Sequence, residues 1–447
     1  MFGTSGVRGR VGESVTADVA LSIGRAVGTD TDRVVVGRDA RETGETLQAA
    51  LVAGLRETGA DVVDVGRAAT PTVARSITDR SADAGIVVTA SHNPPQDNGF
   101  KLWTPSGQAY SPDQQTEIEE LIESKAYALA DWTGQGSHES WAGAATYHKR
   151  ALVEAGRAAA VDGSLSSLSV VVDLGNGMGG VAADALFELG ADVETINAQQ
   201  DGRFPGRPSE PTAQTCTTLA ATVDAVDADL GIAHDGDADR MMAVTDEGEF
   251  VPGDLLLAIF GMEVASAGDS VAAPVDTSLA VSDALADIGV ELVYTKVGDV
   301  YVADRAKDAD VAFGGEPSGA WIFPEETLCP DGPLAAVKLA ALAAAEPLSD
   351  RLARIERYPL RRTVVETDDK AAAMERIAAA VRESYEEVST LDGVRVDTDD
   401  GWFLIRPSGT EPKIRVTAEA REAAATEELL DRALDIVEAR TGRGSTE

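Results

Sequence analysis

Residues 33–66 read RVVVGRDARETGETLQAALVAGLRETGADVVDVG, and this stretch decides the fold class. An apolar run typical of a buried strand leads through a turn into an amphipathic helical segment, and a second apolar run follows a glycine. A strand, a crossover helix and a parallel strand together form the βαβ unit. The stretch therefore predicts an α/β fold with parallel strands.

Two later stretches, residues 169–197 and 270–298, repeat the same order of strand, turn, helix, glycine and strand. The repetition indicates a triplicated unit, so we predict three similar mixed α/β domains with βαβ units. The end of the chain differs, and its patterns predict a smaller C-terminal α+β domain. Its strands are expected over residues 359–366, 393–397, 401–405 and 413–419, and its helices over residues 370–389 and 426–440.

The domain boundaries follow from these patterns. The chain has 447 residues, of which 44% are hydrophobic, and this is enough for several buried cores at roughly 150 residues per domain. We place the boundaries near Tyr147, Gly253 and Tyr358. The predicted domains span residues 1–147, 148–252, 253–357 and 358–447.

The charge of the chain excludes some classes of partner. The formal net charge is −38, which argues against binding to nucleic acid or to an anionic membrane, because both need a basic surface. No apolar run reaches the length of a transmembrane helix, and the opening MFGTSGVRGR lacks the apolar core of a signal peptide. We therefore expect a cytoplasmic protein. Such acidity also predicts a halophilic source, in which salt screens the self-repulsion.

The segment GIVVTASHNPPQDNGFK, residues 85–101, is the first that carries chemistry. A strand pattern runs directly into a loop rich in Ser, His, Asn, Pro and Gly, which predicts a stiff, non-helical turn. Ser91 falls at the carboxyl end of that strand, where open α/β sheets bind their ligands. For this segment alone, a purely structural loop is the alternative interpretation.

The segment DGDADR, residues 235–240, follows another short apolar strand pattern. Asp235, Asp237 and Asp239 alternate on a tight loop, where three carboxylates repel one another unless a cation lies between them. All-oxygen ligands favour Mg²⁺, Mn²⁺ or Ca²⁺, and Arg240 excludes an EF-hand because it stands where that loop needs glycine. We favour a metal site over a solvated acidic turn.

Two further segments carry weaker signals. FGGEPSGAW, residues 313–321, places Glu316 and Ser318 between glycines, which suits binding of sugar hydroxyls but is equally typical of a plain turn. RPSGTEPKIR, residues 406–415, offers hydroxyl, backbone and guanidinium donors. In so acidic a chain, these donors and the basic residues among them predict an anion site. Its residues are Arg406, Ser408, Gly409, Thr410, Lys413 and Arg415.

The segment VVVDLGNGMGG, residues 170–180, supports a competing hypothesis. Gly175, Gly177 and Gly180 fit the GxGxxG pattern of a Rossmann dinucleotide site, and Glu194 stands where a ribose-binding acid would follow. The same unit occurs twice more without these glycines, so we prefer a structural turn. A dinucleotide-dependent oxidoreductase remains an alternative, as does a sugar-phosphate-binding protein without catalysis.

Five segments resemble, in this order, the motifs of the α-D-phosphohexomutase family: FGTSGVRG at residues 2–9, TASHNP, DGDADR, GEPSG and RPSGTEPKIR. Enzymes of this family move a phosphoryl group between the 1- and 6-hydroxyls of a sugar, through an enzyme phosphoserine and a hexose 1,6-bisphosphate intermediate. The resemblance covers nearly the whole chain and implies four domains around one central cleft. It also implies a small-molecule sugar phosphate as partner, and we expect a monomer or homodimer.

The resemblance implies a role for each site residue. Ser91 would be the phosphoserine, and its phosphate would bind Mg²⁺ together with Asp235, Asp237 and Asp239. Lys101 and Arg240 would assist proton transfer and charge stabilisation. The segment of residues 406–415, which we call the terminal loop, would hold the phosphate that is not transferred. The substrate-binding residues would be Arg8, Glu316, Ser318, Arg406, Ser408, Gly409, Thr410 and Arg415.

Two positions depart from the family's patterns and bear on the sugar. Ala320 and Trp321 stand where many bacterial members have His, and Asp299 in KVGDVYV stands where some phosphomannomutases have His. FGTSGVRG and KVGDVYV resemble the members that act on glucosamine phosphate, and an acidic Asp299 would favour the ammonium of glucosamine. We therefore expect glucosamine 6-phosphate and glucosamine 1-phosphate as the preferred pair, with phosphomannomutase or phosphoglucomutase activity as the alternative.

Overall fold

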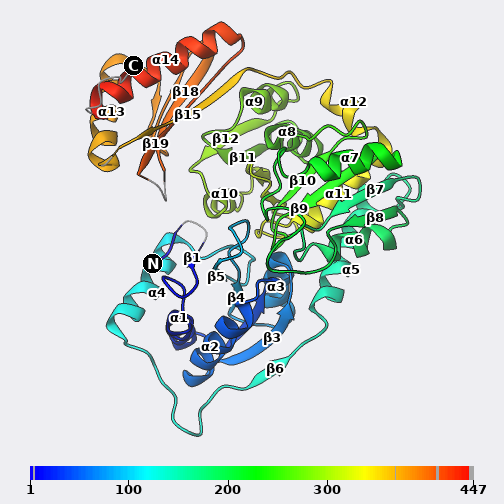
Figure 1. The fold of residues 1–447 in the computed structure, drawn as a ribbon, viewed down its shortest axis with the longest axis vertical. Helices are drawn as coiled ribbons and strands as arrows, with labels where there is room; N and C mark the ends of the chain where they lie inside the picture. The colour runs from blue at the N-terminus through cyan, green and yellow to red at the C-terminus, as the bar shows by residue number, and fades with distance from the viewer. Residues whose placement is uncertain (4–5, 368, 409–411, 442–447) are drawn as a thin grey trace.

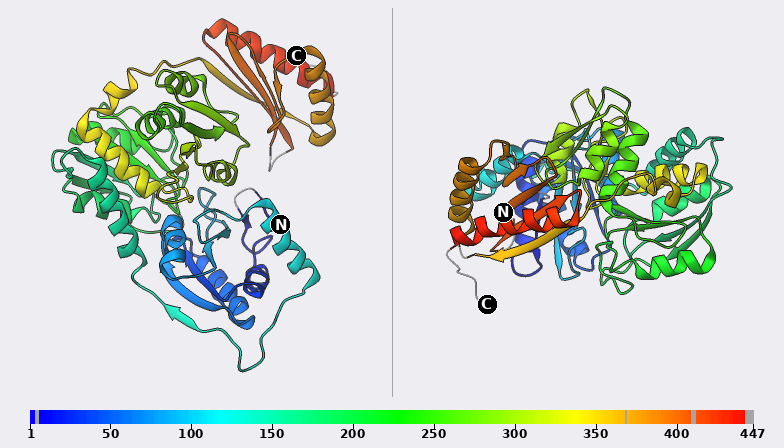
Figure 2. Two further views of the ribbon diagram at one scale, coloured as in Figure 1. Left: turned by 180° about the vertical axis from the view of Figure 1, so that it is seen from behind. Right: turned by 90° about the horizontal axis from the view of Figure 1, so that it is seen from above.

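The computed structural model describes residues 1–3, 6–367, 369–408 and 412–441. Four separate β-sheets follow one another along the chain, each with its own helices (Figure 1). The third domain lies between the second domain and the C-terminal domain, and Figure 2 shows the same arrangement from behind and from above. The predicted fold class, three α/β domains with βαβ units and a smaller C-terminal α+β domain, is confirmed.

The first domain is built on a six-stranded mixed sheet in the order β1-β5-β4-β2-β3-β6. The predicted βαβ unit is present, because β2 and β3 pair in parallel and α2 connects them. The strands β5 and β1 add antiparallel pairs beside β4. The elements are β1 (Val7–Arg10), α1 (Ala17–Thr29), β2 (Arg33–Arg38), α2 (Gly44–Glu57), β3 (Asp61–Arg67), α3 (Thr70–Asp79), β4 (Ala84–Val88), β5 (Asp97–Trp103), α4 (Pro112–Ser124) and β6 (His138–Ser140).

The second and third domains each contain a four-stranded sheet, in the orders β10-β9-β7-β8 and β12-β11-β13-β14. In the second domain β8, β7 and β9 pair in parallel, and β10 is an antiparallel edge strand. In the third domain β12, β11 and β13 pair in parallel, and β14 is an antiparallel edge strand. The second domain comprises α5 (Ala144–Ala159), β7 (Ser169–Asp173), α6 (Gly180–Glu188), β8 (Asp192–Ile196), α7 (Thr217–Val226), β9 (Leu230–His234) and β10 (Met241–Val244). The third comprises α8 (Gly253–Val264), β11 (Ser270–Pro274), α9 (Leu279–Ala286), β12 (Glu291–Thr295), α10 (Asp299–Arg305), β13 (Val311–Gly315), β14 (Trp321–Ile322), α11 (Gly332–Ala345) and α12 (Leu348–Leu352).

The C-terminal domain is a five-stranded antiparallel sheet in the order β15-β19-β18-β17-β16. One expectation is corrected here: the helix predicted over residues 370–389 ends at Ser384, and Val388 and Ser389 form an edge strand instead. The elements are β15 (Leu360–Glu366), α13 (Lys370–Ser384), β16 (Val388–Ser389), β17 (Val394–Asp397), β18 (Gly401–Pro407), β19 (Lys413–Ala420) and α14 (Ala423–Thr441).

The second and third domains share one hydrophobic core, which runs from Leu152 in α5 to Ile355. The helix α11 follows the third sheet in the chain but packs against α5 and α6 of the second domain. Burying apolar surface across both domains fixes the two sheets relative to each other. Among the described residues, no helix combines the length and the apolarity needed to cross a membrane.

Candidate active site

Ser91 lies shortly after β4, at the carboxyl end of an inner strand of the first sheet. Its backbone has φ +50°, in the left-handed region, which turns the chain sharply out of the strand. The Ser91 N–H donates to Thr89 Oγ1 at 2.8 Å, which closes this turn. Only 1% of Ser91 is exposed. The strand and the turn therefore hold the hydroxyl in a buried position at the edge of the sheet.

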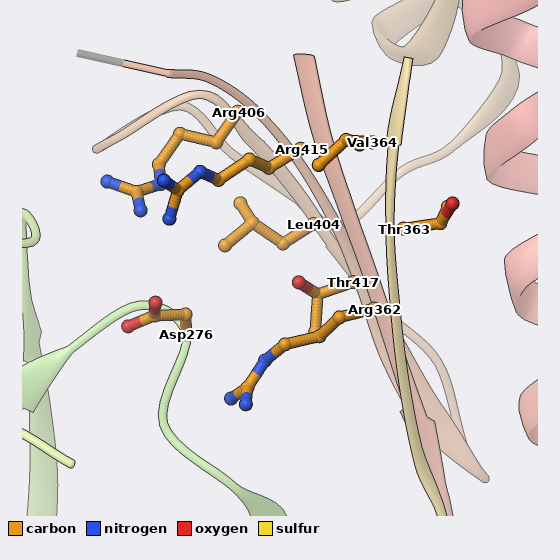
Figure 3. A pocket seen from close by; sticks show the side chains of 8 residues that line it. All are labelled: Asp276, Arg362, Thr363, Val364, Leu404, Arg406, Arg415 and Thr417. Carbon is orange, nitrogen blue, oxygen red and sulfur yellow. The ribbon is translucent and has the colours of Figure 1, made fainter. Parts of the chain in front are cut away.

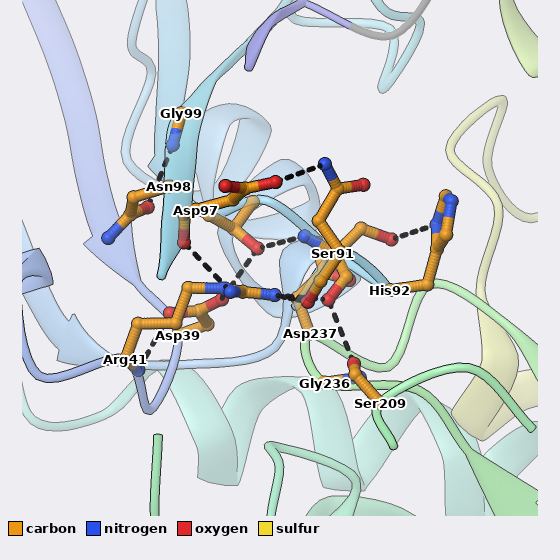
Figure 4. Close-up of polar contacts among 12 residues, drawn as sticks. Asp39, Arg41, Ser91, His92, Asp97, Asn98, Gly99, Ser209, Gly236 and Asp237 are labelled. Carbon is orange, nitrogen blue, oxygen red and sulfur yellow. Dashed lines mark hydrogen bonds and ion pairs between the residues drawn. The ribbon is translucent and has the colours of Figure 1, made fainter. Parts of the chain in front are cut away.

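The loop that carries Ser91 is anchored by Arg41, as Figure 4 shows. The Arg41 guanidinium donates through Nη1 and Nη2 to four carbonyl oxygens of the loop, those of Ser91, Asn93, Pro94 and Asp97. Its Nε pairs with Asp39 at 3.0 Å, and Asp39 also accepts from Thr89. The guanidinium lies over the ring of Phe204, 5.0 Å from its centroid. Arg41 thus holds the loop in its curved conformation by binding these carbonyl oxygens.

Replacing Arg41 with methionine is expected to destabilise the protein by about 3–5 kcal/mol, because the Asp39 charge and the loop carbonyls lose their buried partner. Urea unfolding at constant salt would measure this change. The matched control is Arg203→Met, because Arg203 is 69% exposed in its pair with Asp201 and its loss should cost no more than about 0.5 kcal/mol. Equal effects of the two substitutions would contradict the anchoring role of Arg41.

The acidic loop follows β9 and approaches Ser91 from the second domain. Asp235, Asp237 and Asp239 are buried, and one oxygen of each lies within 4.8 Å of the others. The Ser91 hydroxyl donates to Asp235 Oδ2 at 2.7 Å, and its Oγ lies 3.4 Å from Asp239 Oδ1. The structure therefore brings the predicted hydroxyl and the predicted carboxylates, which come from different domains, into one buried cluster.

Lys101, on β5, forms ion pairs with two of these carboxylates. Its Nζ donates to Asp237 Oδ2 at 2.9 Å and also to Asp239 Oδ2. Burial opposes a charge on Lys101, but the Asp237 and Asp239 carboxylates outweigh burial and raise the pKa of the ammonium. Lys101 therefore stays protonated and acts as a fixed cation beside Ser91.

The geometry of the acidic loop fits a divalent cation. Burial, together with the Asp239 and Asp237 carboxylates, raises the pKa of Asp235 well above its usual range. Asp237 Oδ2 accepts from Lys101 and from Thr70, but among the described residues nothing donates to the buried Asp237 Oδ1. A buried carboxylate oxygen without a partner is costly, and a cation with oxygen ligands such as Mg²⁺ would complete it.

The glycine-rich turn after β7 supports the acidic loop. The Met178 N–H donates to the Gly236 carbonyl at 3.1 Å. A Cβ on Gly177 would lie 2.5 Å from the same carbonyl, and a Cβ on Gly179 would lie 2.7 Å from the His234 ring. Glycine is needed here because protein backbone and side chains fill the space above the turn. The packing agrees with the structural turn that we preferred to a dinucleotide site.

Glu316 and Ser318 lie on the turn after β13, next to the end of the acidic loop. Glu316 Oε1 accepts from the Gly298 N–H at 2.8 Å, and Oε2 accepts from the Ser318 hydroxyl at 3.3 Å. An isolated backbone bridge joins Arg240 to Ala320 on the same turn. The structure thus places this turn and Arg240 side by side.

Arg8, on β1, approaches the acidic loop from the other side. It pairs across the sheet with Gly99, beside Lys101 on β5. Burial lowers the pKa of Arg8, and the nearby Asp239 and Asp237 carboxylates partly offset this effect. Within the part of the chain that the structure describes, its buried Nε has no hydrogen-bond partner. Arg8 can therefore donate to a bound anion.

Arg406 and Arg415 line a separate cavity of about 460 Å³ between the C-terminal sheet and the third domain (Figure 3). The two arginines are direct cross-strand partners on β18 and β19. Arg362 of β15 and Asp276 of the third domain line the same cavity, and neither was singled out from the sequence. Ser408 is buried nearby in the chain. The predicted Gly409 and Thr410 lie outside the described residues.

Comparison with known proteins identifies the family. Four models of the phosphoglucomutase/phosphomannomutase family match in order: domain I at residues 1–128, domain II at 151–248, domain III at 252–358 and the C-terminal domain at 360–436. The chain belongs to this family. It is therefore a phosphohexomutase, an isomerase, and the oxidoreductase alternative is set aside.

Similar proteins cover almost all of this phosphohexomutase. The probable phosphoglucosamine mutase of Methanopyrus kandleri is 44% identical over 98% of this chain and 97% of the relative. The protein of the same name in Methanosarcina barkeri is 45% identical over 94% of this chain and 95% of the relative. A phosphoglucomutase/phosphomannomutase family protein from Burkholderia thailandensis has a solved structure that superposes with a TM-score of 0.87, at 30% identity, over 100% of this chain and 99% of that one.

We expect Glu316 to give the phosphohexomutase a pH dependence, if it binds sugar hydroxyls as the sequence predicts. Burial, helped by the Asp299 carboxylate, raises the pKa of Glu316 to about 7. Below that pH the protonated side chain is a poorer acceptor for sugar hydroxyls, so we expect kcat/KM to rise with pH through about 7. The pKa of Glu316 in the folded protein exceeds the ordinary glutamate value of 4.5, so ionisation of Glu316 lowers stability as the pH rises from about 4.5 to 7.

The matched measurement uses Glu316→Gln, which keeps an acceptor oxygen but cannot ionise. Both proteins are assayed from pH 5.5 to 8.5 with the same sugar phosphate, because the substrate's own phosphate titrates near pH 6. The substitution should remove the change in kcat/KM near pH 7, which we assign to Glu316, and leave the change that comes from the substrate phosphate. An unchanged profile in the variant would assign the pH dependence to another group.

Proposed function

We propose that this phosphohexomutase interconverts glucosamine 6-phosphate and glucosamine 1-phosphate through a phosphoserine at Ser91. The observation that carries the proposal is the Ser91 hydroxyl, buried 2.7 Å from Asp235 in a cluster of carboxylates contributed by a second domain. A hydroxyl in such a place is prepared to carry a phosphate only if a cation offsets the carboxylates, and Asp235, Asp237 and Asp239 would hold Mg²⁺.

The residues around Ser91 would have different roles in phosphoryl transfer. Such a transfer is mainly positioning and neutralisation of charge, and bound Mg²⁺ would supply Lewis-acid neutralisation at the Ser91 phosphate. Lys101 and Arg8 add fixed cationic donors on the first-domain side. Arg240 adds one beside the turn after β13, residues 316–320, which we call the sugar-binding turn. Since Lys101 pairs with Asp237 and Asp239, we assign it charge stabilisation.

Exchange between the 1- and 6-positions needs a second phosphate site. The phosphoryl group on Ser91 passes to the free hydroxyl of the sugar: the Ser91 Oγ–P bond breaks, an O–P bond forms on the sugar, and the proton of the sugar hydroxyl is transferred, in net terms, to Ser91 Oγ. The resulting hexose 1,6-bisphosphate turns over and returns its other phosphate to Ser91. Arg406 and Arg415, with the terminal loop, would hold the phosphate that stays on the sugar, because arginine forks pair bidentately with phosphate.

Glucosamine is favoured over mannose and glucose by two lines of support. The relatives from Methanopyrus kandleri and Methanosarcina barkeri, which match nearly the full chain, bear the name probable phosphoglucosamine mutase. The sugar-binding turn is also acidic, because Glu316 and Asp299 interact electrostatically in the same buried region. Carboxylates there would attract the ammonium at C2 of glucosamine, which the other two sugars lack. A cytoplasmic location and a monomeric or homodimeric state remain predictions from the sequence.

The sugar assignment is tested by kcat/KM for the 1-phosphates of glucosamine, glucose and mannose under one set of conditions. We expect glucosamine 1-phosphate to lead by about tenfold or more, equivalent to about 1.4 kcal/mol in transition-state binding. A tenfold lead for mannose or glucose 1-phosphate would make the protein a phosphomannomutase or phosphoglucomutase. Absence of isomerisation with all three sugars, together with retained binding, would indicate a protein that only binds sugar phosphates.

A further inference from the structure

The segment that enters α10 is held between carboxylates from two domains. The Val297 N–H donates to Asp392 Oδ2 at 3.1 Å, and Asp392 belongs to the C-terminal domain. The next N–H along the chain, that of Gly298, donates to Glu316 Oε1 at 2.8 Å. Gly298 has φ +133°, which a residue with a side chain rarely adopts. Two consecutive backbone donors therefore face two acids, one on the C-terminal domain and one on the sugar-binding turn.

The same oxygen of Asp392 also accepts a hydrogen bond from Arg406. Arg406 lines the cavity of about 460 Å³ described above, which we call the phosphate cavity. Arg406 Nη1 donates to Asp392 Oδ2 at 3.2 Å, so one carboxylate oxygen is shared by the guanidinium and the Val297 N–H. The side chains of Arg406 and Asp392 are 17% and 22% exposed, so this pair is mostly shielded from solvent. Polar contacts thus link Arg406 to Asp392, Asp392 to the Val297 N–H, and the next N–H along the chain, that of Gly298, to Glu316.

The C-terminal domain is docked so that Asp392 stays at this position. Glu419 accepts from the Ser278 hydroxyl at 2.5 Å and from the Leu279 N–H at 2.8 Å, at the start of α9. Arg395, three residues after Asp392, donates to the Val275 carbonyl and lies over the Tyr294 ring at 4.5 Å. These buried contacts join the C-terminal domain to the third domain.

We propose that Asp392 is a positioning residue that couples occupation of the phosphate cavity to the sugar-binding turn. The proposal rests on the proposed function, in which Arg406 binds the phosphate that stays on the sugar. A phosphate in the cavity competes with Asp392 for the Arg406 guanidinium. As Arg406 turns to the phosphate, Asp392 Oδ2 keeps the Val297 N–H as its partner. Their hydrogen bond strengthens, and the Gly298 N–H is held against Glu316.

The first test uses Asp392→Asn, which is isosteric and keeps an acceptor oxygen but loses the charge. Removing the competing anion should tighten binding of inorganic phosphate about threefold to tenfold, while loosening the sugar-binding turn should lower kcat about tenfold. Titration calorimetry with inorganic phosphate and a mutase assay measure the two quantities. The control is Asp399→Asn, which removes the same charge from an exposed site of the same domain and should change neither.

A residue that only supports the fold would, when replaced, weaken phosphate binding and kcat together, and that outcome would overturn the coupling, as would no change in either quantity. A second measurement needs no variant: hydrogen–deuterium exchange of the peptide containing Val297 and Gly298 in the wild-type protein should slow when inorganic phosphate is added. Exchange that does not respond to phosphate would refute the proposal. Loss of the proposed function would appear separately, as a wild-type protein without mutase activity.

Discussion

Replacing Ser91 with alanine is expected to lower mutase activity on the order of 10³-fold or more, because the substitution removes the atom that carries the phosphoryl group in the proposed mechanism. The fold should be retained, since Arg41 binds the Ser91 carbonyl and not its hydroxyl. The measurement combines the rate of conversion of glucosamine 1-phosphate with phosphopeptide mass spectrometry. The wild-type protein, incubated with a hexose 1,6-bisphosphate, should carry a phosphate on Ser91.

The control for this experiment is Ser124→Ala, at the exposed end of α4, which should have wild-type activity and no effect on phosphorylation. Full activity in Ser91→Ala would refute the phosphoserine mechanism. Loss of activity combined with phosphate on another residue would relocate the nucleophile but leave the isomerase assignment intact.

Replacing Asp237 with asparagine is expected to lower activity by about 10²–10³-fold, by analogy with the loss of one preorganised electrostatic group at a transition state. Asp237 Oδ1 is a buried carboxylate oxygen with no partner among the described residues, and an amide at this position is a much weaker ligand for Mg²⁺. Weaker binding of Mg²⁺ to the variant should also be measurable without catalysis, as a smaller stabilisation of the fold by the ion. Mg²⁺ at 100 times its Kd should stabilise the wild-type protein by about 2.7 kcal/mol, and the variant much less at the same concentration.

Thermal unfolding with and without Mg²⁺, in potassium chloride at constant ionic strength, provides this measurement. The control is Asp224→Asn, an exposed carboxylate on α7, which should keep both the activity and the Mg²⁺-dependent stabilisation. Chelation of metal ions with EDTA should inactivate the wild-type protein reversibly. A rate that survives EDTA, or an equal gain in melting temperature in Asp237→Asn, would remove the cation from this site.

The sequence predicted the fold class and the central cluster because both depend on local patterns. The βαβ pattern of residues 33–66 predicts the parallel pair β2 and β3, and the alternating carboxylates of DGDADR predict a loop that crowds its charges. Ser91 and Asp235 were each singled out from their own segment. Their 2.7 Å contact crosses a domain boundary, which periodicity alone does not describe.

The sequence did not reveal the polar residues whose partners are far away along the chain. Arg41 lies in the short stretch RDARETG, where a charged residue is usual, and only the tertiary structure shows that it binds four loop carbonyls. Arg362 reaches the phosphate cavity because strand pairing places β15 beside β19. The sequence patterns did not single out His148. It is fully buried, 2.8 Å from Thr72 and 3.2 Å from Asp331, because α5 packs between two domains.

The left-handed backbone at Ser91 restricts which nucleophile this site accepts. Its φ of +50° lies in a region that β-branched residues avoid, because their second γ substituent crowds the neighbouring peptide. Threonine offers the same hydroxyl chemistry, yet it would strain the turn that aims the oxygen at Asp235. A Ser91→Thr exchange, which is conservative in chemical terms, is therefore a radical one for this turn.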